Sequence, residues 1–198
     1  MKTRSIAALA AAMMMLTAAC RGGGAAEARA AVPVDSARPI PQALAQFRAP
    51  LPPVRELGGA FAENRDTLVR RFVAALEAAD SAAFTPMMMN RAEFAWLYYE
   101  TDPQAKPPYE LLPDLMWSQT LQQGERGISR ALTRFGGRAL AYRGYTCAHD
   151  AARGPNHVWT DCRLSVVDAD GNRIDVRLFG GILERGGRFK LLSYANEL

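Results

Sequence analysis

The residues best suited to chemistry in this 198-residue chain lie within one short stretch. They are two cysteines and two histidines, Cys147, His149, His157 and Cys162, with a carboxylate at Asp161. Such side chains could bind zinc, which takes thiolate, imidazole and carboxylate ligands. However, their spacing matches no familiar zinc motif, both histidines are expected in loops, and regular pleating would turn His157 and Cys162 to opposite strand faces. We therefore predict no metal site and look for another role for the two cysteines.

The acidic residues that could transfer protons each have a structural explanation. Asp66 is expected to cap a helix, Glu93 and Glu100 to be solvated, and Asp161 to pair with Arg163 on one strand face. The sequence contains no Ser-His-Asp context, nucleophile elbow, phosphate-binding glycine loop or metalloprotease motif. It therefore assigns neither a catalytic residue nor a cofactor.

The beginning of the chain has the pattern of an export signal. Lys2 and Arg4 precede an apolar run at 6–16 that is too short to span a bilayer. The run ends in Leu-Thr-Ala-Ala-Cys, which resembles the lipobox of bacterial lipoproteins, although threonine replaces the leucine that is commonest three positions before the cysteine. The resemblance implies that the signal peptide, residues 1–19, is removed and that Cys20 becomes the lipidated first residue.

Lipidation of Cys20 would anchor the exported chain to a bacterial membrane, facing the periplasm or the cell exterior. Several acyl chains on one cysteine hold a protein durably, whereas a single chain binds only marginally. The alternative is an ordinary secretory signal in which the cysteine is incidental. In either case the remainder of the chain is expected in an oxidising compartment.

Once Cys20 is lipidated, Cys147 and Cys162 remain as an even pair outside the cytoplasm. They lie on two predicted strands joined by one loop, so we predict a cross-strand disulfide between them. The chain-entropy model gives about 3 kcal/mol for closing a loop of about fifteen residues, an upper estimate where a hairpin already restrains the ends.

The segment 20–57 is predicted to be a tether. It is rich in alanine and proline and shows little apolar periodicity, which is typical of a semi-extended spacer. A short helix at 42–48, with Leu44 and Phe47 docked on the domain, is the alternative. The net charge is +4, and without Lys2 and Arg4 the chain has 22 basic residues against 20 acidic, a balance that does not suggest nucleic-acid binding.

The last third, 139–194, is predicted to form an antiparallel meander of four strands. Its clearest hairpin has a three-residue loop ending in Gly171, a geometry in which that glycine takes a positive φ. The pairs expected on one face are Val166 with Ile174, Leu164 with Val176, and Cys162 with Leu178.

The other strands of the meander have weaker patterns. A second hairpin is expected to pair Leu183 with Phe189 and to need a bulge near Gly180-Gly181. The first strand is expected at 139–147, followed by a polar loop that runs to Asn156.

Four helical segments precede the meander. Apolar spacing predicts helices at 64–79, from residue 82, at 91–99 and at 113–135, the last ending at Gly136-Gly137. Gly124 and Gly127 inside the last helix imply either close packing or a break. Helices followed by a meander predict one α+β domain, residues 58–198, with helices packed on a curved sheet of about four strands.

The run Phe-Val-Ala-Ala-Leu-Glu-Ala-Ala-Asp-Ser-Ala-Ala-Phe at 72–84 and a terminal strand at 189–194 resemble the nuclear transport factor 2-like superfamily. The resemblance implies an α+β cone around an apolar pocket, a fold shared by steroid isomerases, dehydratases, polyketide cyclases and many non-catalytic modules. Aromatic residues would line the pocket. The candidates are Trp96, Tyr99, Trp117, Tyr142, Phe179 and Tyr194.

These observations predict a membrane-anchored, non-catalytic module that binds a small apolar ligand or a protein partner. The alternative is an enzyme that performs proton transfer on a hydrophobic substrate. An enzyme should bury an unpaired Asp, Glu or His in the aromatic pocket, whereas a binding module needs only apolar and neutral groups there. A homodimer formed through the sheet is a third expectation.

Overall fold

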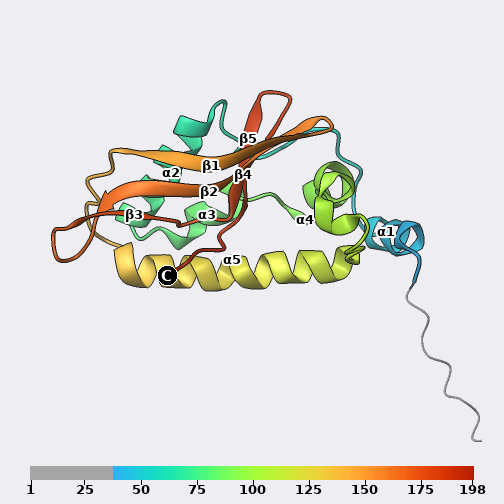
Figure 1. Ribbon diagram of the computed structural model, residues 1–198, viewed down its shortest axis with the longest axis horizontal. Coiled ribbons are helices and arrows are strands. Elements are labelled where there is room, and N and C mark those ends of the chain that lie inside the picture. The colour runs from blue at the N-terminus through green and yellow to red at the C-terminus, as the bar shows by residue number, and fades with distance from the viewer. Residues whose placement is uncertain (1–37) are drawn as a thin grey trace, which may run out of the picture. The chain divides into compact units, whose positions relative to one another are not determined.

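The computed structural model of the protein describes residues 38–198 (Figure 1). The predicted signal peptide and the lipidated Cys20 lie outside these residues. The main helices are α1 (Ile40–Arg48), α2 (Arg65–Glu77), α3 (Phe84–Met87), α4 (Arg91–Glu93) and α5 (Pro113–Phe135). The strands are β1 (Gly144–Arg153), β2 (Asn156–Val167), β3 (Arg173–Val176), β4 (Gly181–Arg185) and β5 (Arg188–Ser193).

Short helical turns connect the main helices. They are η1 (Ser81–Ala83), the π-helical turn η2 (Phe94–Tyr98), η3 (Tyr99–Thr101) and η4 (Pro103–Ala105). None of the helices between residues 38 and 198 combines the length and the apolar character needed to span a bilayer.

The strands form one antiparallel sheet of five strands in the order β1-β2-β4-β5, with β3 also paired to β2. Strand β2 is long enough to pair with β4 at its start and with β3 at its end, while β1 covers its other edge. The long helix α5 runs along the sheet (Figure 1). The predicted α+β class, with helices packed on an antiparallel sheet, is confirmed, with five strands where about four were expected.

The first predicted hairpin is confirmed. Val166 pairs with Ile174 and Leu164 with Val176, and Gly171 has a φ of 82°. The third expected pair does not form, because β3 ends at Val176 and Leu178 lies beyond it in the buried core.

The second hairpin is shifted by one residue from the prediction. Arg185 pairs with Arg188 across a two-residue turn, so Glu184, and not Leu183, lies opposite Phe189. Gly186 and Gly187 both have positive φ, which two consecutive glycines accept without strain and which gives the shorter turn. The expected irregularity occurs at Gly181, but the additional residue is Leu192, on β5.

The predicted bounds of the first strand were wrong. Strand β1 starts five residues later than expected and continues through the predicted polar loop to Arg153, where a turn at Gly154 leads into β2. Most of its residues are exposed, so β1 has no apolar pattern that would predict it. The strand is formed by its pairing with β2.

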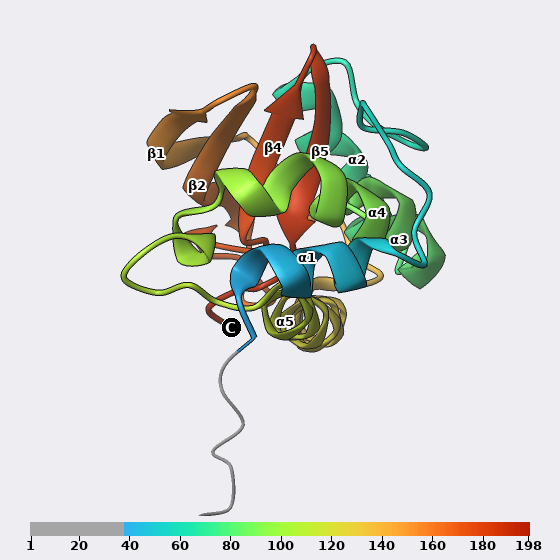
Figure 2. The ribbon, with the colours of Figure 1, turned by 90° about the vertical axis from the view of Figure 1, so that its right-hand side faces the viewer.

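Two buried clusters form the core, and they lie on opposite faces of β4. Ile182 belongs to the first cluster, with α2 and the C-terminal half of α5. Leu183 belongs to the second, with α1, the segment from α4 to η3, and the N-terminal half of α5. Figure 2 shows the helical segment that follows α4 in front of β4 and β5, and α2 behind them. The sheet is therefore covered on both faces at this end.

Helix α1 lies inside the segment that was predicted to be a tether. Leu44 and Phe47, spaced to share one helix face, are buried, and the Phe47 ring packs edge-on against Phe94 at 5.8 Å between centroids. Leu57 is also fully buried. The folded unit therefore extends N-terminally beyond the predicted boundary at residue 58, at least to Ile40, because apolar contacts hold a segment whose prolines suggested a spacer.

The glycines inside α5 give a matched pair for a stability test. A Cβ added at Gly127 would lie 2.6 Å from the carbonyl carbon of Tyr194, whereas one at Gly124 would meet Met88 Sδ at 3.6 Å, an ordinary contact. We expect Gly124→Ala to raise the free energy of unfolding by up to about 1 kcal/mol through helix propensity. Gly127→Ala should lower it by about 1–3 kcal/mol through overpacking. Urea unfolding of both variants measures this, and equal effects would contradict the close packing seen at Gly127.

Candidate functional site

A groove of about 810 Å³ runs between α1 and the segment that contains η2 and η3. One wall is α1 and the chain that follows it, and the other carries the rings of Trp96 and Tyr99. The lining residues are Ile40, Pro41, Leu44, Ala45, Arg48, Ala49, Leu51, Pro53, Trp96, Tyr99, Glu100 and Ala105. Most are apolar, and the volume suits a small organic ligand.

Local sequence explains why Trp96 and Tyr99 face α1. The Asn90 side chain accepts from the Glu93 N–H, and the Glu93 carboxylate accepts from the Asn90 N–H. This capping box fixes the start of the segment. The following π-helical turn η2 contains Trp96. Turns of this kind are rare and are frequently found at functional sites.

Arg48 joins the two walls. Its Nε donates to the Ala95 carbonyl at 2.9 Å, its Nη2 pairs with the Glu100 carboxylate, and its guanidinium stacks 4.5 Å from the centre of the Trp96 ring. Among the described residues that line the groove, Arg48 is the one cation, and these contacts pair it, so the charges of Arg48 and Glu100 offset each other. The groove is therefore electrically balanced as well as apolar.

One buried donor beside the groove is left without a partner. The indole Nε1–H of Trp96 has no hydrogen-bond partner within residues 38–198. A buried donor without a partner is costly, but this one is not exposed to the groove, so a ligand reaches it only if neighbouring side chains move. The Tyr99 hydroxyl, in contrast, donates to the Leu111 carbonyl at 2.6 Å, and burial raises the pKa of this hydroxyl.

The six predicted pocket aromatics do not converge on one site. Trp96 and Tyr99 line the groove, and Trp117 is buried behind it against Phe94. Phe179 and Tyr194 are buried in the other cluster, where both pack on Phe72.

Tyr142 packs on the edge of that other cluster, with its ring 5.9 Å from the Arg70 guanidinium. Burial raises the pKa values of Tyr142 and Tyr194, so both side chains remain neutral.

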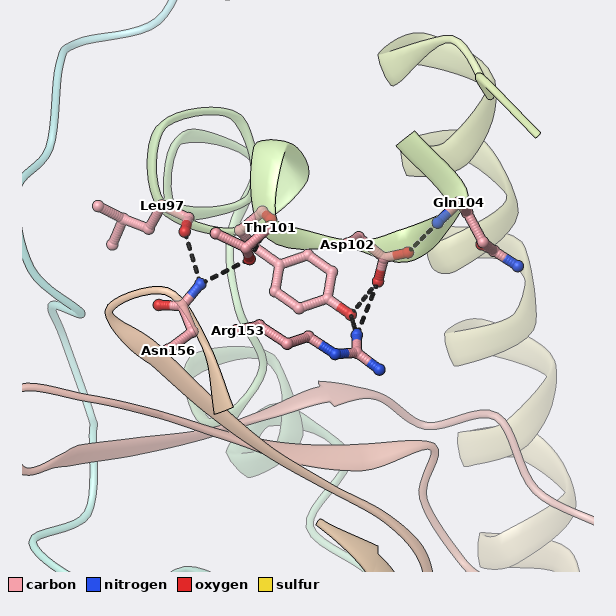
Figure 3. Close-up of polar contacts among 7 residues, drawn as sticks. Leu97, Thr101, Asp102, Gln104, Arg153 and Asn156 are labelled. Atoms are coloured by element: carbon pink, nitrogen blue, oxygen red, sulfur yellow. Dashed lines mark hydrogen bonds and ion pairs between the residues drawn. The ribbon is translucent and has the colours of Figure 1, made fainter. Parts of the chain in front are cut away.

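A second, more polar site lies where η4 meets the β1-β2 hairpin (Figure 3). The Tyr98 hydroxyl donates to Asp102 Oδ2, and Arg153 Nη1 lies 3.3 Å from the same oxygen. Asp102 Oδ1 accepts from the Gln104 N–H at 2.8 Å. The Asp102 carboxylate is thus paired through both oxygens.

These contacts determine the protonation of the cluster. Burial, and then the Asp102 charge, raise the pKa of Tyr98 far above its ordinary value, so its hydroxyl is a permanent donor. Three donors contact the two oxygens of Asp102, so most of the acceptor capacity of this carboxylate is used within the cluster. The cluster can therefore position a ligand.

Asn156 anchors the neighbouring end of the hairpin. Its amide nitrogen donates to the Leu97 carbonyl at 2.7 Å and to Thr101 Oγ1 at 2.9 Å (Figure 3). Its side-chain carbonyl accepts from Arg185 Nη1 at 2.9 Å. All of these groups are buried or half-buried, so the hairpin is fixed to the segment that carries Tyr98 and Asp102.

Glu93 was predicted to be solvated, and this was wrong. It is 1% exposed, and its carboxylate lies 2.9 Å from Lys190 Nζ on β5. Its oxygens also accept from the backbone N–H groups of Gly58 and Asn90. Its role is structural, because it links three parts of the chain in the interior. Glu100, in contrast, is exposed as predicted.

The cysteines and histidines do not form a metal site. Cys147 and Cys162 lie opposite each other on β1 and β2 with their Cα atoms 3.9 Å apart, and they form the predicted disulfide. Within residues 38–198, no three potential metal ligands come together. His157 lies 3.2 Å from Asp150 and stacks on Trp159 at 4.2 Å, and His149 is exposed on β1.

Both histidines are therefore on strands and not in loops as expected. Asp161 lies 3.5 Å from Arg163, as predicted. Asp66 lies in the first turn of α2, whose cap is Asn64.

No protein-family model matches the chain, and no curated protein and no solved structure shows significant similarity to it. The resemblance to the nuclear transport factor 2-like superfamily therefore stays a prediction.

Little in the sequence indicates the polar cluster. Asp102 precedes a proline, which is typical of a helix start and explains its bond to the Gln104 N–H. Arg153 is 51 residues away in a predicted loop, and no local pattern connects it with Asp102. Only the long β1-β2 hairpin brings the two together.

Proposed function

We propose that the protein is a membrane-anchored exported lipoprotein whose folded domain is a non-catalytic module that binds a small apolar ligand. The groove beside α1 is the proposed site, and its rings, aliphatic side chains and balanced charges suit an apolar body.

The observation that carries this proposal is the pairing of the buried carboxylates. Within residues 38–198 the fully buried carboxylates are Glu93 and Asp102, and each has a cationic partner. Neither lines the groove, whose only acid is Glu100, paired with Arg48. Proton-transfer chemistry on a hydrophobic substrate needs an available acid or base near the apolar surface, so these contacts favour binding over the enzyme alternative.

The binding proposal predicts that filling the groove abolishes ligand uptake. The test uses the mature chain with Cys20→Ser, exported by an ordinary cleavable signal so that no detergent is needed. A dansylated undecanoic acid should bind with saturable, blue-shifted emission. Ala45→Phe, an exposed α1 position that lines the groove, should raise its Kd about tenfold or more, which corresponds to a loss of about 1.4 kcal/mol.

The matched control is Gln46→Phe. Gln46 is the next residue on α1, is equally exposed and does not line the groove. It should leave the Kd unchanged. If both variants bind the probe like the parent chain, or if the parent shows no saturable binding, the groove is not the ligand site.

The anchoring part of the proposal has its own test. A membrane-bound product should lose residues 1–19 and carry acyl chains on Cys20, which mass spectrometry of the N-terminal peptide detects directly. Cys20→Ser in the natural leader should remove the acyl mass. An unmodified Cys20 in the membrane fraction would refute the anchor while leaving the groove proposal to its separate test.

A further inference from the structure

We propose that the polar cluster of Tyr98, Asp102 and Arg153 is a second binding site, specific for a small hydroxylated carboxylate such as a sugar acid. This site is separate from the α1 groove. It does not depend on the function proposed above.

The site is a cavity of about 310 Å³ between the polar cluster, the N-terminal half of α5 and the end of β5. Besides Asp102 and Arg153, its lining combines apolar side chains with the hydroxyl groups of Tyr98, Thr120, Thr160 and Ser193. Ligand cavities of this size are typical of small metabolites.

Arg153 presents an unused edge at this cavity. A single nitrogen, Nη1, makes its contacts with Asp102 and Tyr98, at 3.3 and 3.5 Å. Within residues 38–198 no hydrogen bond involves its Nε or Nη2, and Figure 3 shows these nitrogens turned away from Asp102. In a guanidinium, Nε–H and Nη2–H point in the same direction and form the fork that binds a carboxylate through both oxygens.

The cluster is preorganised for this role. Asp102 holds the guanidinium from its other side, and the Tyr98 hydroxyl donates to the same carboxylate, so the fork is oriented before a ligand arrives. The side chain of Arg153 is 23% exposed, which leaves the fork accessible. An adjoining surface hollow beside Arg153 is lined by both Lys106 and Glu100, so these two side chains add no net charge there.

The remaining lining determines the rest of the ligand. Thr120, Thr160 and Ser193 line the cavity and contribute hydroxyls. The Thr120 hydroxyl donates to the Met116 carbonyl and is left as an acceptor. Hydroxyls match the hydroxyl groups of a polyol and not a second charge. A carboxylate on the Arg153 fork with a hydroxylated body in the cavity satisfies both halves of the site.

The test is a titration of the ¹⁵N-labelled mature chain carrying Cys20→Ser with D-glucuronate, D-galacturonate and D-gluconate. At least one should produce saturable shifts at residues that line the cavity. D-Glucose and D-galactose, which share the hydroxyls but have no carboxylate, should bind at least tenfold more weakly. Sulfate, an anion without hydroxyls, should also be weaker.

Variants then assign the contact. Arg153→Gln should raise the Kd about tenfold or more, and Arg153→Lys, which keeps the charge without the fork, should also weaken binding. Arg126→Gln, an exposed position on α5 outside the cavity, should have no effect.

If Arg153→Gln does not fold, Arg153→Lys and Thr160→Val replace it in the test, and both should weaken binding of the sugar acid. Absence of binding by all three sugar acids, equal binding of sulfate, or unchanged affinity in the Arg153→Lys variant would each overturn the proposal.

Discussion

Replacing Glu93 with glutamine is expected to lower the free energy of unfolding by about 3–5 kcal/mol, the cost typical of removing one partner of a buried ion pair. The side chains of Glu93 and Lys190 are 1% and 3% exposed, so the Lys190 ammonium would stay in the interior without a countercharge. The Gly58 and Asn90 N–H groups would also have to share a neutral amide in place of a carboxylate. Equilibrium urea unfolding, followed by circular dichroism, measures the loss.

The double variant Glu93→Gln/Lys190→Met separates the pair from its surroundings. Because it leaves no uncompensated charge, it should be less destabilised than either Glu93→Gln or Lys190→Met alone. Glu100→Gln, which alters an exposed acid in the same segment, should cost less than about 1 kcal/mol. Additive single effects in the double variant would show that the two charges do not stabilise each other.

Removing the disulfide is expected to cost up to about 3 kcal/mol. The bond closes a loop of fifteen residues between β1 and β2, and the β1 strand is mostly exposed, so little apolar packing would replace the crosslink. The suitable change is Cys147→Ala/Cys162→Ala, because Cys162 is fully buried and serine would place a hydroxyl in the core. Thermal or urea unfolding gives the difference.

Reduction provides the internal control for that experiment. The parent chain with Cys20→Ser should show no free thiol before reduction and two afterwards, and its reduced form should unfold with the stability of the double alanine variant. Reductant should not change the variant itself. Two reactive thiols in the untreated protein would contradict the disulfide.

The best-predicted elements are those with local signals at both ends. Helix α5 has proline at its first position and a Gly-Gly pair after its last, and its predicted bounds agree with the structure. The β2-β3 hairpin has a glycine-terminated loop and alternating apolar residues on both strands, and its register agrees. In these elements turn chemistry and periodicity indicate the same structure.

The elements that could not be predicted depend on contacts between distant residues. Gly186-Gly187 allows two turn lengths, and packing of β4 between the two clusters selects the shorter one. Glu93 has the sequence context of an exposed capping residue, but Lys190, 97 residues later, brings it into the core. The short helix with Leu44 and Phe47 docked, which the sequence offered as the alternative to a tether, is the one that forms. The groove beside it was missed because no local pattern connects α1 with Trp96 and Tyr99.

The α1 groove is proposed to bind an apolar ligand next to Trp96, and the tryptophan indoles can report this binding directly. The chain has three tryptophans, and their indole N–H groups give three separate resonances in a ¹H–¹⁵N spectrum. Trp96 lines the groove, Trp117 lies behind it, and Trp159 stacks on His157 with Arg65 over its ring. Titration with dodecanoate should shift the Trp96 indole N–H saturably and leave that of Trp159 unchanged, whereas an unmoved Trp96 resonance, or a shift at Trp159 alone, would contradict the account.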